Sequence, residues 1–325
     1  MAVPMDPAAF VPGAADETTA LLGDLLYDPL YRLDTTLTPR PALAAALPAV
    51  SADGLTWSID LVKGARFHDG SRVTSADVVA SLQLAASPSC PFARDLCESV
   101  SAHLAGAAAE GAERVTIALR DPWAPFLAEA LGRVPVVSTA ALGTAADSLV
   151  AAARDVDAAA LRSRVERITE ETNAERCLVA APPSGCRLAD YVAELSATLG
   201  DAGAAVPPPA RFTSADGSVD GEAHGAALLQ SVGSLATVLM SEGIDRLAAA
   251  TPLVDIVEHP LGGGPFRLES YDPGVAVGLR RHPGHVPQAG LSGITLRIVR
   301  DPSVAATAIR AGDVDWMLEL PADQA

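Results

Sequence analysis

The stretch from Asp53 to Leu82 reads DGLTWSIDLVKGARFHDGSRVTSADVVASL and decides the fold of this chain. Asp53-Gly54 is a turn signal, because glycine tolerates positive φ and aspartate caps its own backbone. Apolar and polar residues then alternate, which is the period of a half-buried strand. The side chains expected on its buried face are Leu55, Trp57, Ile59 and Leu61.

A helix is predicted directly after this strand. Lys63-Gly64 and Asp69-Gly70 mark the intervening turns, and Thr74 opens the helix. Asp77 stands three residues further on, in the manner of a capping box. Val78, Val79 and Leu82 give the helix one apolar face. Strand and helix therefore follow each other closely, as in an α/β protein.

The same residues resemble the early signature of the family 5 extracellular solute-binding proteins, the peptide, dipeptide and nickel receptors of ABC importers. A second block, HPLGGGPF from His259 to Phe266, resembles the family pattern PVGTGPY. Shorter stretches that resemble the family are LLYDPL at 25–30, PALA at 41–44, IVRD at 298–301 and AIRAGDVD at 308–315. The likeness covers about residues 5–138 and 255–320.

The resemblance implies an α/β fold: a periplasmic-binding-protein-like (type II) lobe with a mixed β-sheet flanked by helices, plus a helical insertion. We expect residues 1–138 to form the first part of lobe I. Residues 139–254 are expected to be a mostly helical insertion or accessory subdomain, because apolar residues recur there at helical spacing. Residues 255–325 are expected to return to lobe I and to end near the crossover into a second lobe that this chain lacks.

The function implied by the resemblance is that of a solute-binding component of an ABC importer. Such a receptor captures peptides or a similar small solute in a cleft between two lobes, closes by a hinge and docks on the permease subunits. The alternative is a ligand-sensing regulatory module of the same fold.

One loop is a candidate ligand-binding site. In the resembling peptide receptors, part of the main-chain edge that holds the ligand comes from the loop before the first helix. Here that loop is approximately Gly13, Ala14, Ala15, Asp16 and Glu17. Asp16 and Glu17 could contact a ligand ammonium group or cap the following helix, and we favour capping. The residues that usually fix the ligand termini belong to the second lobe, so the resemblance assigns none of them here.

The sequence contains no motif of a known catalytic centre. There is no G-x-S-x-G elbow, no H-E-x-x-H, no Walker loop and no C-x-x-C. Three consecutive glycines at 262–264 indicate close backbone packing rather than a phosphate loop, because Pro265 follows and no Lys-Ser/Thr does. His68 is predicted to be structural. His282 and His285 are separated by Pro283-Gly284, which disfavours a metal pair. We therefore expect no enzyme, no metal and no cofactor.

The chain is strongly acidic, with 40 acidic and 23 basic residues and a net charge of −17. This balance argues against sequence-independent nucleic-acid binding and against docking on an anionic membrane surface. No apolar run has the length of a membrane span, and the first residues do not resemble a signal peptide. A relative of these receptors is expected on the extracellular face of the membrane or in the periplasm. Either a leader has been removed, which we favour, or this copy is cytoplasmic. The resemblance allows a lipid anchor in the full-length protein.

Four cysteines occur as two close pairs, Cys90 with Cys97 and Cys177 with Cys186. Neither spacing fits a zinc knuckle. Two local disulfides in an oxidising compartment are the interpretation that we favour, although three pairings exist on paper and four buried thiols are the alternative.

Overall fold

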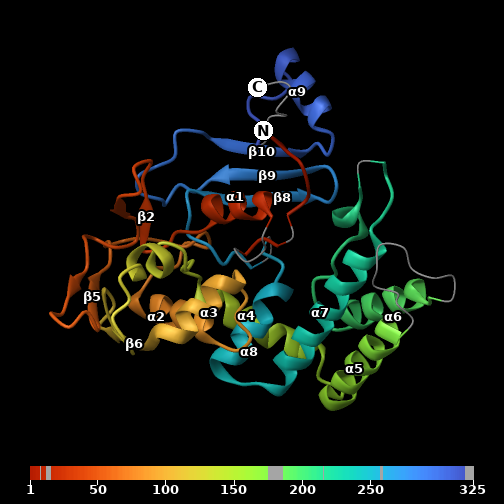
Figure 1. Ribbon diagram of the computed structural model, residues 1–325, viewed down its shortest axis with the longest axis horizontal. Coiled ribbons are helices and arrows are strands. Elements are labelled where there is room, and N and C mark those ends of the chain that lie inside the picture. Colours follow the sequence, from red (N-terminus) through yellow and green to blue (C-terminus); the bar gives the residue numbers. More distant parts are fainter. Residues whose placement is uncertain (8, 12–15, 175–185, 215, 257–258, 319–325) are drawn as a thin grey trace.

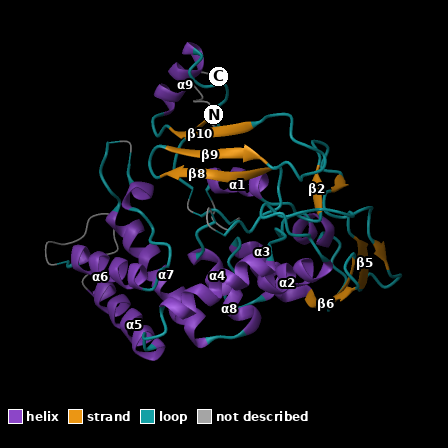
Figure 2. Ribbon diagram, turned by 180° about the vertical axis from the view of Figure 1, so that it is seen from behind, coloured by secondary structure: helices purple, strands orange, loops and turns teal. Residues whose placement is uncertain are grey.

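The computed structural model describes residues 1–7, 9–11, 16–174, 186–214, 216–256 and 259–318. Helices and strands follow in a mixed α/β order (Figures 1 and 2). The helices are α1 (Glu17–Leu26), α2 (Ser75–Ala86), α3 (Arg94–His103), α4 (Thr139–Ala152), α5 (Ala158–Ala174), α6 (Leu188–Asp201), α7 (Gly221–Met240), α8 (Gly243–Ala250) and α9 (Pro302–Ala311), with short turns η1 (Leu127–Leu131), η2 (Pro209–Phe212) and η3 (Thr251–Leu253). The strands are β1 (Ala2–Val3), β2 (Tyr31–Leu33), β3 (Pro39–Pro41), β4 (Ala49–Val50), β5 (Thr56–Asp60), β6 (Leu104–Glu110), β7 (Arg114–Leu119), β8 (Phe266–Asp272), β9 (Ala276–Arg281) and β10 (Gly293–Ile298).

A mixed sheet joins the beginning of the chain to its last third, as predicted. Its strand order is β1-β10-β9-β8, with β1 parallel to β10 and the other pairs antiparallel. Helix α1 lies against this sheet beside β8 (Figure 1). The inward residues of β9 and β10, Val277, Leu279 and Leu296, are buried, so one face of this sheet belongs to the apolar core.

A second, antiparallel sheet contains the decisive stretch, in the order β4-β5-β7-β6. Trp57, Ile59 and Leu61 are buried as the alternation predicts, whereas Leu55 precedes the strand and is only half-buried. Helix α2 begins where Thr74 predicts it, and the Asp77 carboxylate accepts a hydrogen bond from the Thr74 backbone N–H at 2.9 Å. The same carboxylate accepts from the backbone N–H of Thr139 at 3.2 Å, so the cap of α2 also anchors the start of α4.

The helices α4 to α8 occupy most of the segment 139–250, in agreement with its helical pattern. Helix α7 is central there, because it contacts α4, α5, α6 and α8 (Figure 2). Its buried residues include Leu228, Val232 and Leu235, which continue into the main apolar core. The division of the chain at residues 138 and 254 remains a prediction.

Within the described residues, α7 alone has the length and apolar composition of a membrane-spanning helix. The prediction that no apolar segment reaches that length was therefore wrong. Its buried face packs on neighbouring helices of the same segment, which accounts for its apolar composition without a bilayer.

A disulfide links Cys90 to Cys97, as predicted, and joins the loop after α2 to helix α3. The second predicted pair involves Cys177, which lies outside the described residues; Cys186 is disulfide-bonded.

Candidate ligand-binding site

The predicted ligand loop ends at the first turn of α1. Asp16 is the N-cap of this helix, and its carboxylate accepts a hydrogen bond from the Thr19 backbone N–H at 2.7 Å. The favoured capping role of Asp16 is thus confirmed. Glu17 lies in the first turn and is exposed, where a carboxylate stabilises the positive end of the helix. Gly13, Ala14 and Ala15 lie outside the described residues, and the binding role of the loop remains a prediction.

A buried carboxylate fixes the residues before this loop to the mixed sheet. The Asp6 side chain is fully buried, and its Oδ2 accepts a hydrogen bond from Arg300 Nη2 at 2.9 Å. Its Oδ1 accepts from the Gly274 backbone N–H at 2.9 Å and from the Tyr271 hydroxyl at 3.2 Å. The N-terminal segment is therefore bound to the β8–β9 turn and to the end of β10.

The η2 turn, which precedes α7, packs beside this carboxylate. The Ala210 carbonyl accepts a second hydrogen bond from Arg300 Nη2, at 2.9 Å. The neighbouring Arg211 is half-buried, and its Nε is enclosed without a hydrogen-bond partner in the part of the chain that the structure describes. Burial lowers the pKa of Arg211, while the nearby ionisable groups of Tyr271, Asp6 and Asp16 act against that shift.

The three glycines at 262–264 lie against the end of α1, as the close-packing interpretation predicted. A Cβ on Gly262 would lie 2.0 Å from the Leu26 carbonyl oxygen, and one on Gly264 would lie 2.6 Å from the Tyr27 nitrogen. Only glycine allows this approach of two backbones. The Gly264 N–H donates to the Leu26 carbonyl at 3.0 Å, so the segment closes the helix end.

Two histidines, the half-buried His68 and the buried His282, share one carbonyl of this glycine segment. His68 Nε2 lies 3.1 Å and His282 Nδ1 lies 3.2 Å from the Gly264 oxygen. A carbonyl only accepts, so each of these nitrogens carries its proton. Burial lowers the pKa of His68 to about 4 and also lowers the pKa of His282. Both rings are therefore neutral and structural at neutral pH, as was predicted for His68.

His285 is instead held as a cation. Its Nε2 lies 2.8 Å from Asp28 Oδ2 and its Nδ1 lies 2.7 Å from the Pro287 carbonyl, so both nitrogens face acceptors. Burial acts to lower the pKa of His285, but the hydrogen bond and charge of Asp28 outweigh it and raise the pKa. Asp28 also accepts from Arg32 at 3.0 Å; together His285 and Arg32 overcome its burial and lower its pKa.

The described residues include no group of three or more histidines, cysteines or carboxylates that could hold a metal ion. The contacts of His282 and His285 are made instead to backbone carbonyls and to one carboxylate.

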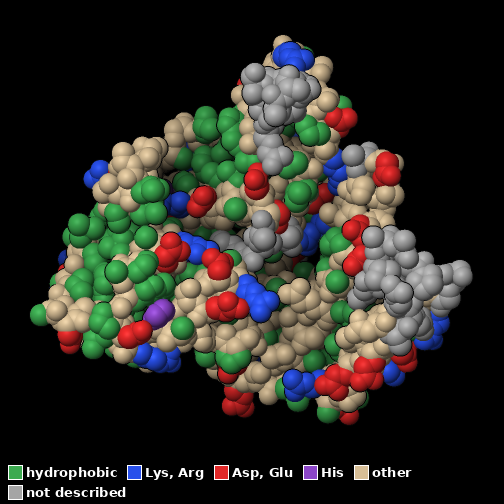
Figure 3. Space-filling model, viewed as in Figure 1, with side chains coloured by type: hydrophobic (Ala, Val, Ile, Leu, Met, Phe, Trp, Pro, Cys, Tyr) green, Lys and Arg blue, Asp and Glu red, His purple; other side chains and the backbone are tan. Residues whose placement is uncertain are grey.

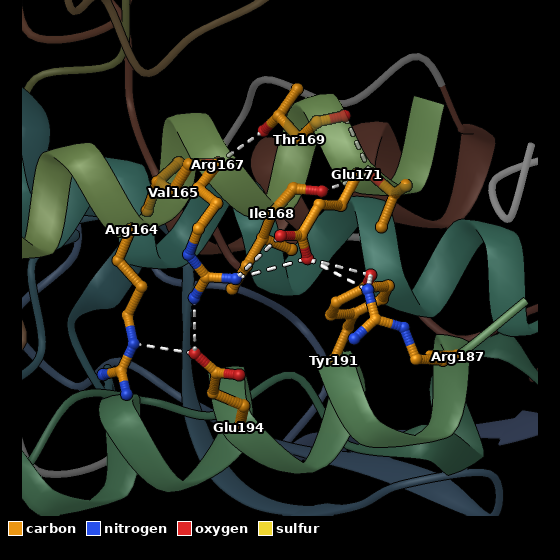
Figure 4. A network of polar contacts seen from close by, with 10 residues as sticks. Arg164, Val165, Arg167, Ile168, Thr169, Glu171, Arg187, Tyr191 and Glu194 are labelled. Carbon is orange, nitrogen blue, oxygen red and sulfur yellow. Dashed lines mark hydrogen bonds and ion pairs between the residues drawn. The ribbon is translucent and has the colours of Figure 1, made fainter. Parts of the chain in front are cut away.

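An open groove of about 610 Å³ lies elsewhere, between α5 and α6. Figure 4 shows the ion-pair network beside it: Glu194 accepts from Arg164 at 2.7 Å, and Glu171 accepts from the Tyr191 hydroxyl at 3.0 Å. The arginine and glutamate side chains are between 31% and 49% exposed, so their ion pairs contribute little to stability and serve to align the two helices. The groove contains no residue of the predicted ligand loop.

Sequence reasoning missed the residues that surround the loop. Tyr271 and Arg300 belong to blocks that resemble the family, and their positions there were the available signal. Asp6 carried no signal, because its partners are as far as 294 residues away in sequence.

Comparison with known proteins agrees with this architecture. The pattern described as bacterial extracellular solute-binding proteins, family 5 Middle, matches residues 38–160 and 234–325. Protein XP55 of Streptomyces lividans is 36% identical over 112 residues, which are 34% of this chain and 20% of that protein.

Solved structures share the fold at low sequence identity. The oligopeptide-binding protein AppA of Bacillus subtilis, in complex with a nonapeptide, superposes with a TM-score of 0.59 at 16% identity, over 99% of this chain and 44% of AppA. AgaA of A. tumefaciens R10, in complex with agropinic acid, gives the same TM-score, identity and coverage. This chain thus spans less than half of the length of either receptor. With its mixed sheet, flanking helices and two matched segments, the chain belongs to family 5 of the bacterial extracellular solute-binding proteins.

Proposed function

We propose that this chain is the ligand-holding lobe of a solute-binding component of an ABC importer, and that its ligand is a peptide or a similarly small solute. The match of the family pattern to both an early and a late segment carries this proposal. AppA is described with a bound nonapeptide and AgaA with agropinic acid, so related folds hold both peptidic and non-peptidic solutes.

In the proposed mechanism the protein makes and breaks no covalent bond. An extended peptide would pair its main chain with the loop that includes Gly13, Ala14, Ala15, Asp16 and Glu17, as an added strand. Closure around the ligand by a hinge would then present one surface to the permease subunits. The protein would act on the extracellular face of the cell membrane or in the periplasm.

Calorimetric titration with pools of di-, tri- and tetrapeptides tests the proposal. We expect saturable heat and a raised melting temperature, because a ligand that binds only the folded state stabilises it by about 2.7 kcal/mol at one hundred times its Kd. Free amino acids of the same composition are the control. Absence of heat and of a melting shift with every pool would contradict the proposal.

Two substitutions distinguish a ligand contact from helix capping at the loop. Asp16→Ala is expected to lower stability by about 1 kcal/mol through the lost cap. Glu17 is exposed, so Glu17→Gln should leave the unligated melting temperature nearly unchanged. A weaker affinity for peptides in Glu17→Gln, with no loss for N-acetylated peptides, would identify Glu17 as the contact of the ligand ammonium.

A further inference from the structure

Arg211 has no hydrogen bond through its guanidinium and no ion pair in the described part of the chain, although the protein carries a net charge of −17. The neighbouring Arg300 pairs with Asp6 at 2.9 Å. Among the basic side chains that the structure describes, Arg211 alone has an enclosed nitrogen without a hydrogen-bond partner. This enclosed nitrogen is therefore a local property of its site.

The backbone that carries Arg211 is held on both sides. The Ala210 carbonyl is bound by Arg300 at 2.9 Å, and the Phe212 ring stacks on His224 with their centroids 5.1 Å apart. His224 is buried and its Nε2 lies 2.9 Å from the Pro207 carbonyl. Arg211 thus projects from a turn that is fixed between the mixed sheet and α7.

The buried Asp6 carboxylate acts on Arg211 through its charge, but its hydrogen bonds go to other groups. Both oxygens of Asp6 are engaged, one by Arg300 and the other by Tyr271 and the Gly274 N–H. Asp16 acts on Arg211 through its charge, and its carboxylate accepts a hydrogen bond within α1. Arg211 therefore lies close to the start of α1, next to the loop predicted to hold the ligand.

An enclosed guanidinium nitrogen without an acceptor costs free energy, because the bond to water is lost and not replaced. None of the three guanidinium nitrogens has a hydrogen-bond partner among the described residues. Nε is enclosed by the protein, and the two Nη nitrogens remain in contact with solvent. Figure 3 shows a recess between the mixed-sheet part and the helices α5 to α7, with basic side chains beside it. An anion from solution can reach the Nη side of such a group.

We propose that Arg211 binds a carboxylate group of the captured solute. The two Nη nitrogens of the planar guanidinium match the two oxygens of a carboxylate, and such a charge-assisted pair supplies acceptors that the folded chain does not provide at these nitrogens. This inference rests on the proposed function and names the class of ligand: a peptide with a free C-terminus or another organic acid.

The test compares wild-type protein with Arg211→Gln, Arg211→Lys and the control Arg94→Gln. Arg94 is 91% exposed and pairs with Glu98, far from the site. In the first experiment, the melting temperature is measured in sodium acetate and in sodium chloride at equal ionic strength. In the second experiment, calorimetry measures the binding of tripeptide pools that have either a free or an amidated C-terminus.

We expect acetate to raise the melting temperature of the wild type and of Arg94→Gln, but not of Arg211→Gln. The Kd for free-carboxylate tripeptides should rise about 10- to 100-fold in Arg211→Gln, as for a lost charged hydrogen bond. Arg211→Lys should lie between the two, because it keeps the charge without the fork. Without ligand, Arg211→Gln should melt at or above the wild-type temperature; a marked drop would show a structural cation and overturn the proposal.

The two proposals fail in different ways. Peptide binding that is equal for free and amidated pools, and equal in Arg211→Gln, overturns the role of Arg211 and leaves the receptor function standing. Acetate stabilisation that depends on Arg211, without binding of any peptide, supports the carboxylate site and contradicts a peptide receptor. Absence of both effects in the wild type overturns both.

Discussion

Replacing Asp6 by alanine should be among the most destabilising single changes in this protein. The substitution removes a fully buried carboxylate that accepts hydrogen bonds from Arg300, Tyr271 and Gly274. It leaves the Arg300 guanidinium, whose side chain is only 19% exposed, without its counter-charge. Removing one partner of a buried ion pair costs about 3–5 kcal/mol.

A count of the lost bonds gives the same range. The charged bond to Arg300 is worth about 1.5–3 kcal/mol, and the bonds from the Tyr271 hydroxyl and the Gly274 N–H about 1 kcal/mol each. For a protein of this size, about 2 °C of melting temperature is lost per kcal/mol, so the melting temperature should fall by about 6–10 °C.

Urea denaturation followed by tryptophan fluorescence measures the change, with an unchanged m-value as the sign that the unfolded state is the same. Asp60→Ala is the matched control, because Asp60 pairs with Arg114 at 2.7 Å while both side chains are more than half exposed. That pair should contribute little. The double variant Asp6→Ala with Arg300→Met should recover part of the loss. Equal effects of Asp6→Ala and Asp60→Ala, or strict additivity in the double variant, would refute the reasoning.

Three further changes have definite expected outcomes. Because the pKa of His285 is raised in the folded state, its pairing with Asp28 stabilises the fold fully below pH 6.5, and this stabilisation is lost as the pH rises through the folded-state pKa. The difference in unfolding free energy between wild type and His285→Gln should therefore shrink from pH 6 to pH 8.5. A constant difference in urea titrations over this range would contradict the assignment. Gly264→Ala places a methyl group against the backbone at the end of α1 and should cost about 1–3 kcal/mol or more, whereas Gly290→Ala, which meets no atom within 4 Å, should be nearly neutral in the same titration. Reduction of the Cys90–Cys97 disulfide should lower stability by about 2–3 kcal/mol on the chain-entropy account, and a melting temperature unchanged by reductant would argue against it.

Local structure was predictable where short-range chemistry fixes it. The strand at β5 and the capped helix α2 follow from alternation and from the Thr74–Asp77 spacing, and both appear as expected. In α9 the determining contacts are equally local: Asp301 caps the helix and Gly312 ends it with φ of 78°. Each of these signals lies within a few residues of the element that it determines.

The surroundings of the candidate site were not predictable in this way. Asp28 and His285 are 257 residues apart, and neither has a local pattern that names the other. The sequence suggested for His285 only a test as a metal ligand together with His282, because spacing gives information only about residues that are close in the sequence. Arg211 lies just after three consecutive prolines, and its enclosed position becomes visible only from the packing of the turn η2 on the mixed sheet.

The pairing of β1 with β10 has a consequence for biosynthesis. The Met1 amino group donates to the Thr295 carbonyl across 294 residues, and the first strand finds its hydrogen-bonding edge only there. At about 5–20 residues per second, a ribosome needs roughly 15–60 s to reach that edge after the first strand has been made. Through this interval the nascent chain lacks a complete mixed sheet. A polypeptide that cannot finish this sheet before β10 has been made stays available to chaperones throughout that interval.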